Sequence, residues 1–180
     1  MAGSRLVNTE APRAGTLTLR AMEPGDLPAV IELERIVYPQ PWSERVFEDE
    51  LTQPGRVYAV AMAADRLVGY AGVMVIEDDA HITTLAVDPD VRRDQLGTRL
   101  MLHIVDRVLE MGARHATLEV RMSNRAAQRL YSKFGLAPVG VRKDYYANED
   151  ALVMWATDID AAEYLVRIEQ LRSGLDSGDG

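Results

Sequence analysis

The chain has 180 residues, of which 47% are hydrophobic, and it contains no cysteine. This length and hydrophobic content fit one globular domain with a sizeable core, and the absence of cysteine excludes disulfides, thiolate metal ligands and a cysteine nucleophile. The formal net charge is −8 at pH 7, which argues against general nucleic-acid binding because phosphates repel an acidic surface.

The N-terminal region predicts a leader, a strand and two short helices. Residues 1–15 lack the apolar core of a signal peptide, and no apolar run reaches membrane-spanning length, so we expect a flexible leader on a cytoplasmic protein. Residues 16–20 alternate like a strand. Asp26 suits the N-cap of a helix ending near position 37, and Ser43 that of a second helix ending near position 51. Between them, Pro39-Gln40-Pro41-Trp42 interrupts the helical pattern.

Three antiparallel strands are predicted next. Residues 57–63 and 67–76 are apolar, β-prone runs separated by Ala64-Asp65-Arg66, a spacing typical of a hairpin. Residues 81–87 follow an acidic turn and form the third strand. Pro89 ends that strand, because proline cannot donate to a strand ladder.

Helices and strands alternate in the second half of the chain. Residues 117–120 read as a half-buried strand, in which Glu119 faces away from the core. Asn124 suits the N-cap of a helix ending near Phe134, with Gly135 as its left-handed stop. An earlier helix, closed by Gly112, has its apolar face marked by Leu96, Leu100, Ile104 and Val108.

The C-terminal part predicts two apolar segments and a helix. The apolar segments cover residues 136–141 and 151–155, and the polar, aromatic sequence RKDYYANED between them predicts a loop. Residues 160–171 suit a terminal helix, and residues 173–180 a disordered tail. We therefore expect a leader over 1–15, one domain over 16–157 and a C-terminal extension over 158–180.

Positive charge is concentrated in the middle of this acidic chain. Residues 91–143 hold eleven Lys or Arg against four Asp or Glu, so this segment carries +7 and the remainder −15. A basic zone favours a small polyanionic ligand, although Arg-rich helix faces are also ordinary solvated surface. The loop after position 87 leads into a helix N-terminus, whose free N–H groups suit phosphate.

Two reactive side chains stand close together in the sequence LEVRMSNRAAQRLY. Glu119 lies on the predicted strand and Tyr131 late in the following helix. Taken singly, neither residue indicates a mechanism, because a strand carboxylate is usually solvated and a tyrosine beside apolar residues is usually a core aromatic. His81, His103 and His115 show no metal-ligand spacing, so no metal site is expected.

The order of these features resembles the GNAT acyltransferase superfamily, most closely the bacterial ribosomal-protein alanine N-acetyltransferases and their archaeal and eukaryotic N-terminal acetyltransferase relatives. The resemblance covers residues 17–157 and rests on YPQPWSE, HITTLAVDP, LEVRMSNRAAQRLY and KDYYANEDALVM. It implies a mixed, mostly antiparallel sheet with helices on both faces. Two central parallel strands, at residues 82–87 and 117–120, would splay so that acetyl-CoA can enter.

The resemblance also implies roles for individual residues. Glu119 would be the general base, and Tyr131 would protonate the departing thiolate. Trp42, Tyr145 and Tyr146 would flank a peptide N-terminus, with paired tyrosines gripping its backbone, although a turn anchored by hydrophobic side chains is an equal reading. Backbone groups of Leu85, Ala86 and Val87 would contact the pantetheine of acetyl-CoA, and Asn124 would also contact the cofactor. The loop implied to hold the pyrophosphate consists of Arg92, Arg93, Asp94, Gln95, Leu96, Gly97 and Thr98.

The phosphate loop departs from the family's pattern. The family usually reads Gln/Arg-x-x-Gly-x-Gly/Ala, whereas this chain has Gln95 in place of the first glycine and Asp94 beside it. A side chain there crowds the pyrophosphate, and Asp94 adds negative charge. We expect Gln95 to fit with a helical backbone and an outward side chain, and to weaken cofactor binding without abolishing it.

The leading hypothesis is a monomeric, metal-free N-terminal acetyltransferase that uses acetyl-CoA and acts on the terminal alanine of a small-subunit ribosomal protein, without direct nucleic-acid or membrane binding. An alternative is a GNAT enzyme that acetylates a small-molecule amine. Another is a catalytically weak protein that binds acetyl-CoA and serves as an interaction partner, which Gln95 and the C-terminal extension suggest.

Overall fold

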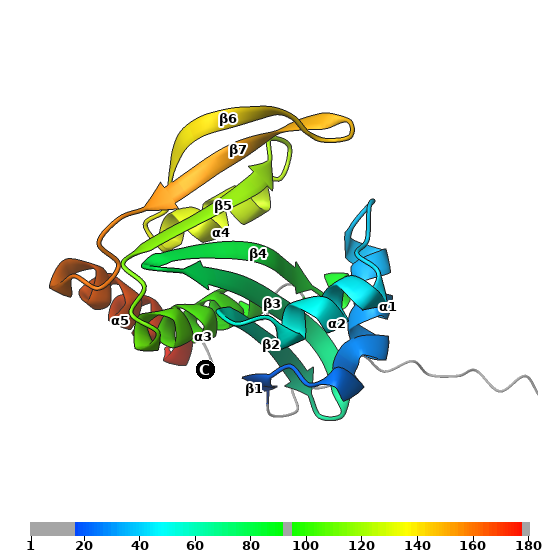
Figure 1. Ribbon diagram of the computed structural model, residues 1–180. Helices are drawn as coiled ribbons and strands as arrows, with labels where there is room; N and C mark the ends of the chain where they lie inside the picture. Colours follow the sequence, from blue (N-terminus) through cyan, green and yellow to red (C-terminus); the bar gives the residue numbers. More distant parts are fainter. Residues whose placement is uncertain (1–16, 92–94, 178–180) are drawn as a thin grey trace, which may run out of the picture.

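The computed structural model describes residues 17–91 and 95–177 and contains one seven-stranded sheet in the order β1-β2-β3-β4-β5-β7-β6 (Figure 1). The strands are β1 (Leu17–Ala21), β2 (Arg56–Ala63), β3 (Arg66–Ile76), β4 (Asp79–Val87), β5 (His115–Arg121), β6 (Ala137–Tyr146) and β7 (Glu149–Ala156). The α-helices are α1 (Leu27–Val37), α2 (Glu44–Thr52), α3 (Leu96–Glu110), α4 (Arg125–Lys133) and α5 (Ala162–Asp176). The predicted mixed, mostly antiparallel sheet is confirmed.

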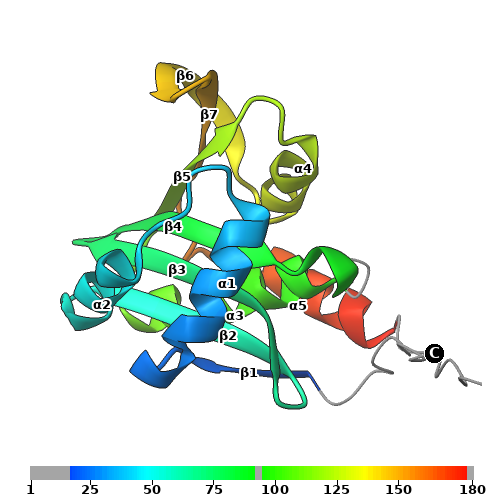
Figure 2. The same ribbon diagram turned by 90° about the vertical axis from the view of Figure 1, so that its right-hand side faces the viewer.

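Helices cover both faces of the sheet. In Figure 2, α1 and α2 lie in front of β2, β3 and β4, whereas α3 and α5 lie behind them. The first face holds an aromatic cluster around Phe47, whose ring lies 5.4 Å from Trp42, 6.2 Å from Tyr58 and 5.8 Å from Tyr70 between centroids. The second face holds the larger core, to which α3 contributes Leu96, Leu100, Met101, Ile104 and Val108.

The sheet parts in its middle. β4 and β5 are parallel, and their pairing is confined to three positions: Asp79 with His115, Ala80 with Ala116, and His81 with Thr117. Beyond these positions β4 continues along β3 to Val87 and β5 continues along β7 to Arg121. The predicted splay between the two central strands is therefore present.

Several local predictions are confirmed by the backbone. The side-chain oxygen of Asn124 accepts a hydrogen bond from the backbone N–H of Ala127, 3.1 Å away, and so caps α4. Gly112 and Gly135 follow α3 and α4 with φ of 86° and 78°. This left-handed region strongly favours glycine, which has no Cβ to clash.

The segment RKDYYANED is not a loop, so this prediction was wrong. β6 runs to Tyr146 and β7 starts at Glu149, which leaves Ala147 and Asn148 as the turn. β6 lies at the edge of the sheet and is exposed over residues 137–145. Because such a strand buries neither face, its sequence lacks the alternation on which a strand prediction depends.

Two further expectations need correction. Asp26 occupies the N-cap position of α1 but makes no capping hydrogen bond; its carboxylate instead takes two 2.7 Å hydrogen bonds from Arg20. α5 continues to Asp176, beyond the predicted end at position 171, because Leu175 is buried in the core. None of the helices in the described ranges is long and apolar enough to span a membrane.

Candidate active site

A cleft of about 890 Å³ opens where β4 and β5 part. Leu85 and Val87 line it from β4, and Glu119 from β5. Tyr131 reaches it from α4, and Trp42 from the loop between α1 and α2. Of the other predicted site residues, the cleft is also lined by Gln95, Gly97, Thr98, Asn124, Tyr145 and Tyr146. Residues far apart in the sequence thus share one cavity.

Glu119 holds a carboxylate whose two oxygens each have a cationic or potentially cationic partner. Its Oε2 lies 2.9 Å from Nε2 of His81 on β4, and its Oε1 accepts a 2.6 Å hydrogen bond from the guanidinium of Arg142 on β6. Only 9% of the Glu119 side chain is exposed, against 57% for Arg142. The carboxylate therefore faces the cleft and not open solvent.

Tyr131 presents a phenol from the opposite side of the cleft. The residue is buried, and burial raises the pKa of its hydroxyl well above the ordinary value of 10; the nearby Tyr38 and Tyr146 act in the same direction. A phenol with a raised pKa keeps its proton at neutral pH. Tyr131 is therefore available as a proton donor.

Tyr38 is a site residue that the sequence did not reveal. Its hydroxyl donates to the carbonyl of Leu85 at 2.7 Å and accepts from the Leu85 N–H at 3.3 Å. These are backbone groups of β4 that face the gap, where no neighbouring strand pairs with them. Its position next to Pro39 in YPQPWSE was the only signal in the sequence.

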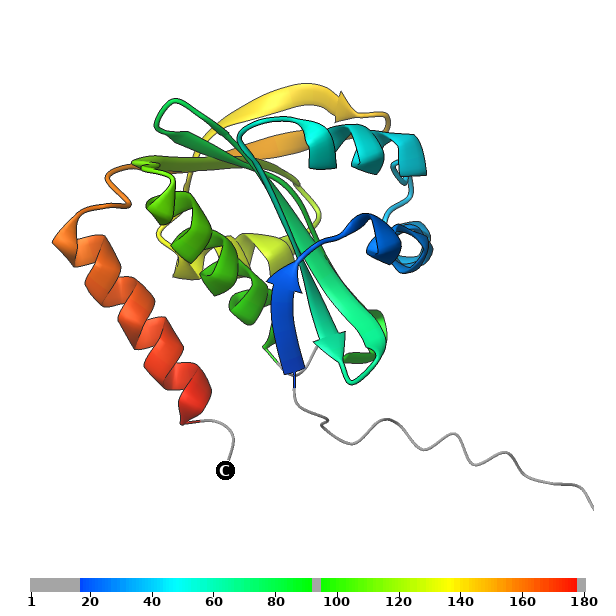
Figure 3. The same cartoon turned by 60° about the horizontal axis from the view of Figure 1, so that its bottom comes forward.

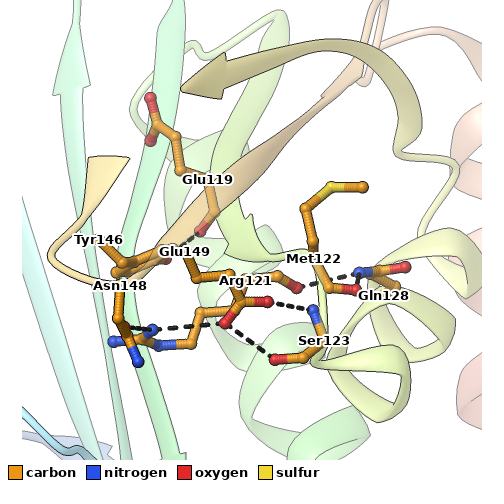
Figure 4. Close-up of polar contacts among 8 residues, drawn as sticks. All are labelled: Glu119, Arg121, Met122, Ser123, Gln128, Tyr146, Asn148 and Glu149. Atoms are coloured by element: carbon orange, nitrogen blue, oxygen red, sulfur yellow. Dashed lines mark hydrogen bonds and ion pairs between the residues drawn. The ribbon is translucent and has the colours of Figure 1, made fainter. Parts of the chain in front are cut away.

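A polar network ties the hairpin of β6 and β7 to the turn between β5 and α4. The carboxylate of Glu149 accepts hydrogen bonds from the backbone N–H of Ser123 at 2.5 Å and its hydroxyl at 3.0 Å, and lies 3.5 Å from the Arg121 guanidinium. Figure 4 shows these contacts, with the Glu119 side chain pointing away from them. The Ser123 hydrogen bonds hold the pKa of Glu149 below its usual value, so the carboxylate is ionised at neutral pH.

The same network orients the two predicted tyrosines. The Arg121 guanidinium lies 4.0 Å from the ring centroid of Tyr146, whose hydroxyl donates to the Glu119 carbonyl at 3.3 Å. The rings of Tyr145 and Tyr146 meet edge to face, 5.1 Å apart. Arg142 lies 4.6 Å from the Tyr145 ring. Cation–π contacts therefore hold both rings at the mouth of the cleft.

Glu34 fixes the opposite rim. This carboxylate is 3% exposed, accepts a 2.9 Å hydrogen bond from the Trp42 N–H and accepts another from the Tyr70 hydroxyl. Burial raises the pKa of Glu34. Glu34 therefore positions the loop that carries Trp42.

Gln95 has a backbone conformation different from the expected one. It precedes α3 with φ 52° and ψ 24°, which is left-handed and not the right-handed helical geometry that we expected. A non-glycine residue pays about 1–2 kcal/mol there, which explains a preference for glycine at this position. Gly97 is needed for another reason: a Cβ at this position would lie 3.1 Å from Leu130 of α4.

Two residues implied to bind acetyl-CoA, Ala86 and Leu96, have side chains that do not line the cleft, so only their backbone groups are available to the cofactor. Ala86 pairs with Tyr70 of β3 and its side chain is buried on the α1 face, away from the cleft. Leu96 is 1% exposed in the main core. Arg92, Arg93 and Asp94 lie outside the described residues. Within the described ranges, no group of three or more His, Asp or Glu side chains is arranged to hold a metal ion.

Comparison with known proteins gives a consistent result. Residues 27–136 match the Acetyltransferase (GNAT) family. A protein of Bacillus subtilis (strain 168), whose name describes it provisionally as a ribosomal protein bS18-alanine N-acetyltransferase, is 42% identical over 142 residues, which are 77% of this chain and 94% of that protein. The ribosomal protein bS18-alanine N-acetyltransferase of Escherichia coli (strain K12) is 34% identical over 150 residues, covering 76% and 95% of the two chains.

A solved structure agrees with these relatives. The crystal structure of the ribosomal-protein-S18-alanine N-acetyltransferase from Escherichia coli superposes with a TM-score of 0.74 at 31% identity. The match covers 79% of this chain and 94% of that one.

Proposed function

Because the chain belongs to the GNAT family of acetyltransferases, and is therefore an acyltransferase, we propose that it acetylates the N-terminal alanine of ribosomal protein bS18 in the cytoplasm. The single observation that carries the proposal is the cleft between β4 and β5, which brings Glu119 and Tyr131 to one cavity. The names of the relatives support the choice of substrate.

The cleft fits acetyl-CoA, the acyl donor of this family. Among the described residues, the N–H and C=O of Leu85 meet the Tyr38 hydroxyl alone on the gap side. The backbone groups of Val87 face the same side, because those of alternate strand residues do. These groups would bind the amide-bearing pantetheine arm. The N-terminus of α3, with Gly97 and Thr98, would hold the pyrophosphate through free backbone N–H groups. When bound, acetyl-CoA supplies an activated acetyl thioester.

Glu119 and Tyr131 supply the proton transfers that this reaction needs. A peptide α-amine has a pKa of about 8, so it is largely protonated at neutral pH and must lose a proton before it attacks. Glu119 takes that proton, directly or through one water. A backbone N–H of β4 stabilises the negative charge that develops on the acyl oxygen. Tyr131, whose raised pKa keeps its phenol protonated, gives its proton to the departing sulfur, and the second proton lost by the amine nitrogen restores the phenol.

The rims of the cleft favour a peptide over a small amine. Trp42 stands on one rim, and Tyr145 and Tyr146 stand on the other. Their aromatic rings and hydroxyls suit the alternating apolar and polar surface of a peptide backbone. A small-molecule amine would not need Trp42 and the paired tyrosines to be held at the two rims of the cleft. The presence of Glu119 and Tyr131 in the same cleft argues against a protein that only binds acetyl-CoA.

The proposal is tested with a panel of N-terminal peptides. The protein is incubated with acetyl-CoA, peptides that differ in their first residue, and a set of polyamines and amino acids, and the products are read by mass spectrometry. Transfer to the α-amine of an alanine-initiated bS18 peptide is expected. Acetylation confined to small amines, or absent, contradicts the proposal.

A further inference from the structure

The carboxylate of Glu119 has two neighbouring side chains with basic groups, of which one can accept a proton. Arg142 donates to Oε1, but a guanidinium stays protonated throughout the working pH range and cannot take another proton. His81 lies 2.9 Å from Oε2 through Nε2, and an imidazole nitrogen without a proton is a base. Any proton that leaves Glu119 along these contacts therefore leaves through His81.

His81 stands at the apex of the splay. It forms the last paired position between β4 and β5, opposite Thr117, and Glu119 follows two residues later on the same face of β5. β4 itself begins at Asp79 and brings the imidazole alongside the carboxylate. The close approach is thus a consequence of strand register, which the sequence could not provide.

His81 also links a secluded group to solvent. The side chain of Glu119 is 9% exposed, whereas that of His81 is 29% exposed. Nε2 faces the carboxylate, which leaves Nδ1 as the ring nitrogen for exchange with water. A base that must be regenerated at each turnover benefits from such an outlet, because a proton retained on the carboxyl blocks the next amine.

We propose that His81 is a positioning residue that also relays the proton from Glu119 to solvent, and this rests on the proposed acetyl transfer. The α-ammonium gives one proton to the Glu119 carboxylate, which leaves a neutral amine and a neutral carboxyl. The carboxyl proton passes to Nε2 of the His81 tautomer protonated on Nδ1, which restores the carboxylate and forms imidazolium. Nδ1 then releases its proton to water, and exchange with water restores the starting tautomer.

Arg142 has a different part in this arrangement. Its guanidinium holds Oε1 from the β6 side and leaves Oε2 directed at β4. A partner on each oxygen, Arg142 on Oε1 and His81 on Oε2, restricts the carboxylate to one orientation. Glu119 is therefore held in place by both His81 and Arg142, but of these two side chains only His81 can accept its proton.

Two substitutions separate relay from orientation. His81→Gln keeps a hydrogen-bond donor for Glu119 but cannot carry a proton, and His81→Ala removes both. We expect both variants to lose about 10-fold or more in kcat, with the peptide KM unchanged. Added imidazole should restore His81→Ala in proportion to its concentration, since the exposed site admits it, and should leave Glu119→Gln inactive. His103→Gln, on α3 and outside the cleft, is the control and should match the unaltered protein.

The outcomes are distinct. Full turnover by His81→Gln shows that orientation alone matters and overturns the relay, as does a loss in His81→Ala that imidazole leaves unchanged. Circular dichroism and denaturation of both variants identify a loss caused by misfolding, which also overturns the relay if it accounts for the entire change. If the unaltered protein acetylates no α-amine, both the proposed function and the relay are wrong. If the unaltered protein is active and the His81 variants are equally active, only the relay is wrong.

Discussion

The two walls of the cleft are built by different forces. On one side, β2 and β3 are buried along most of their length and are covered by helices on both faces. On the other side, β6 is exposed over residues 137–145, and its hairpin is fastened to the β5–α4 turn by Glu149, Ser123 and Arg121. One wall is therefore a packed core, and the other is held by polar contacts at its end.

The packed wall and the wall held by polar contacts should respond differently to salt. Apolar burial is not weakened by charge screening, so the β4 wall is a stable reference for the backbone groups proposed to bind acetyl-CoA. Exposed charged contacts are screened by salt and contribute little stability individually. The hairpin wall carries Arg142, Tyr145 and Tyr146, whose positions therefore respond more readily to substrate and to solution conditions.

The largest expected effect is the loss of the proposed base, Glu119, on the β5 wall. Glu119→Gln keeps the size and most hydrogen bonds of the side chain but cannot accept the amine proton, so kcat should fall by about 10²- to 10⁴-fold. Steady-state kinetics with an alanine-initiated peptide measure this. The control is Glu110→Gln, an exposed carboxylate at the end of α3. Retention of more than a tenth of the activity in Glu119→Gln argues against its role as base.

The second effect contrasts the packing of the two walls directly. Leu100 is fully buried on α3, and Leu100→Ala should lower the free energy of unfolding by about 2–5 kcal/mol. Val141 on β6 is 51% exposed, and Val141→Ala should change the free energy of unfolding by no more than about 0.5 kcal/mol. Urea denaturation followed by circular dichroism compares the two, and equal losses would remove the distinction between packed and tethered walls.

The third effect weakens the hairpin tether without touching the core. Glu149→Gln removes the charge that Ser123 and Arg121 recognise, so the hairpin should lose its fixed position and the peptide KM should rise about 3- to 10-fold. Stability should be almost unchanged. At high salt the peptide KM of the variant should exceed that of the unaltered protein by a smaller factor, because salt already weakens the contacts of Glu149 in the unaltered protein. Glu169→Gln, an exposed carboxylate on α5, is the matched control.

The smallest effect concerns the entrance to α3. Gln95→Gly relieves a left-handed backbone and should raise the free energy of unfolding by about 0.5–1 kcal/mol after the extra chain entropy of glycine is subtracted. We also expect tighter acetyl-CoA binding by calorimetry. Gln53→Gly is the control, since Gln53 has φ −78° and glycine there should destabilise. An unchanged affinity shows that the departure from the family pattern does not affect the cofactor.

Periodicity made most of the fold predictable. Strands that bury one or both faces, such as β2, β3 and β5, carry apolar runs or alternation, and Gly112 and Gly135 marked helix ends through their lack of a Cβ. The second half of β6 was predicted as a loop, because an exposed edge strand has no alternation of buried and exposed residues. The last turn of α5 was not predicted, because the burial of Leu175 depends on the tertiary core and not on the residues beside it in the sequence.

The site was predictable as a set of residues but not as a set of contacts. Glu119, Tyr131 and the paired tyrosines were identified through motifs, and each lines the cleft. His81 was considered only as a metal ligand and dismissed, and Arg142 was counted only as part of the basic segment. Their contacts with Glu119 join positions 38 and 23 residues away, and such distances are set by strand register and not by local sequence.

The three paired positions between β4 and β5 give the molecule a pivot. From His81 to Val87 the strand advances by six residue steps, or about 20 Å at the usual rise. A rotation of about 5° at the paired positions therefore moves the far end of the gap by nearly 2 Å over that length. Behind the pivot, Arg172 of α5 bonds Asp106 of α3 at 2.9 Å, where the two helices run side by side (Figure 3). This contact joins the helix that follows β7 to the helix packed on β4, so it links the two halves of the sheet behind the paired positions.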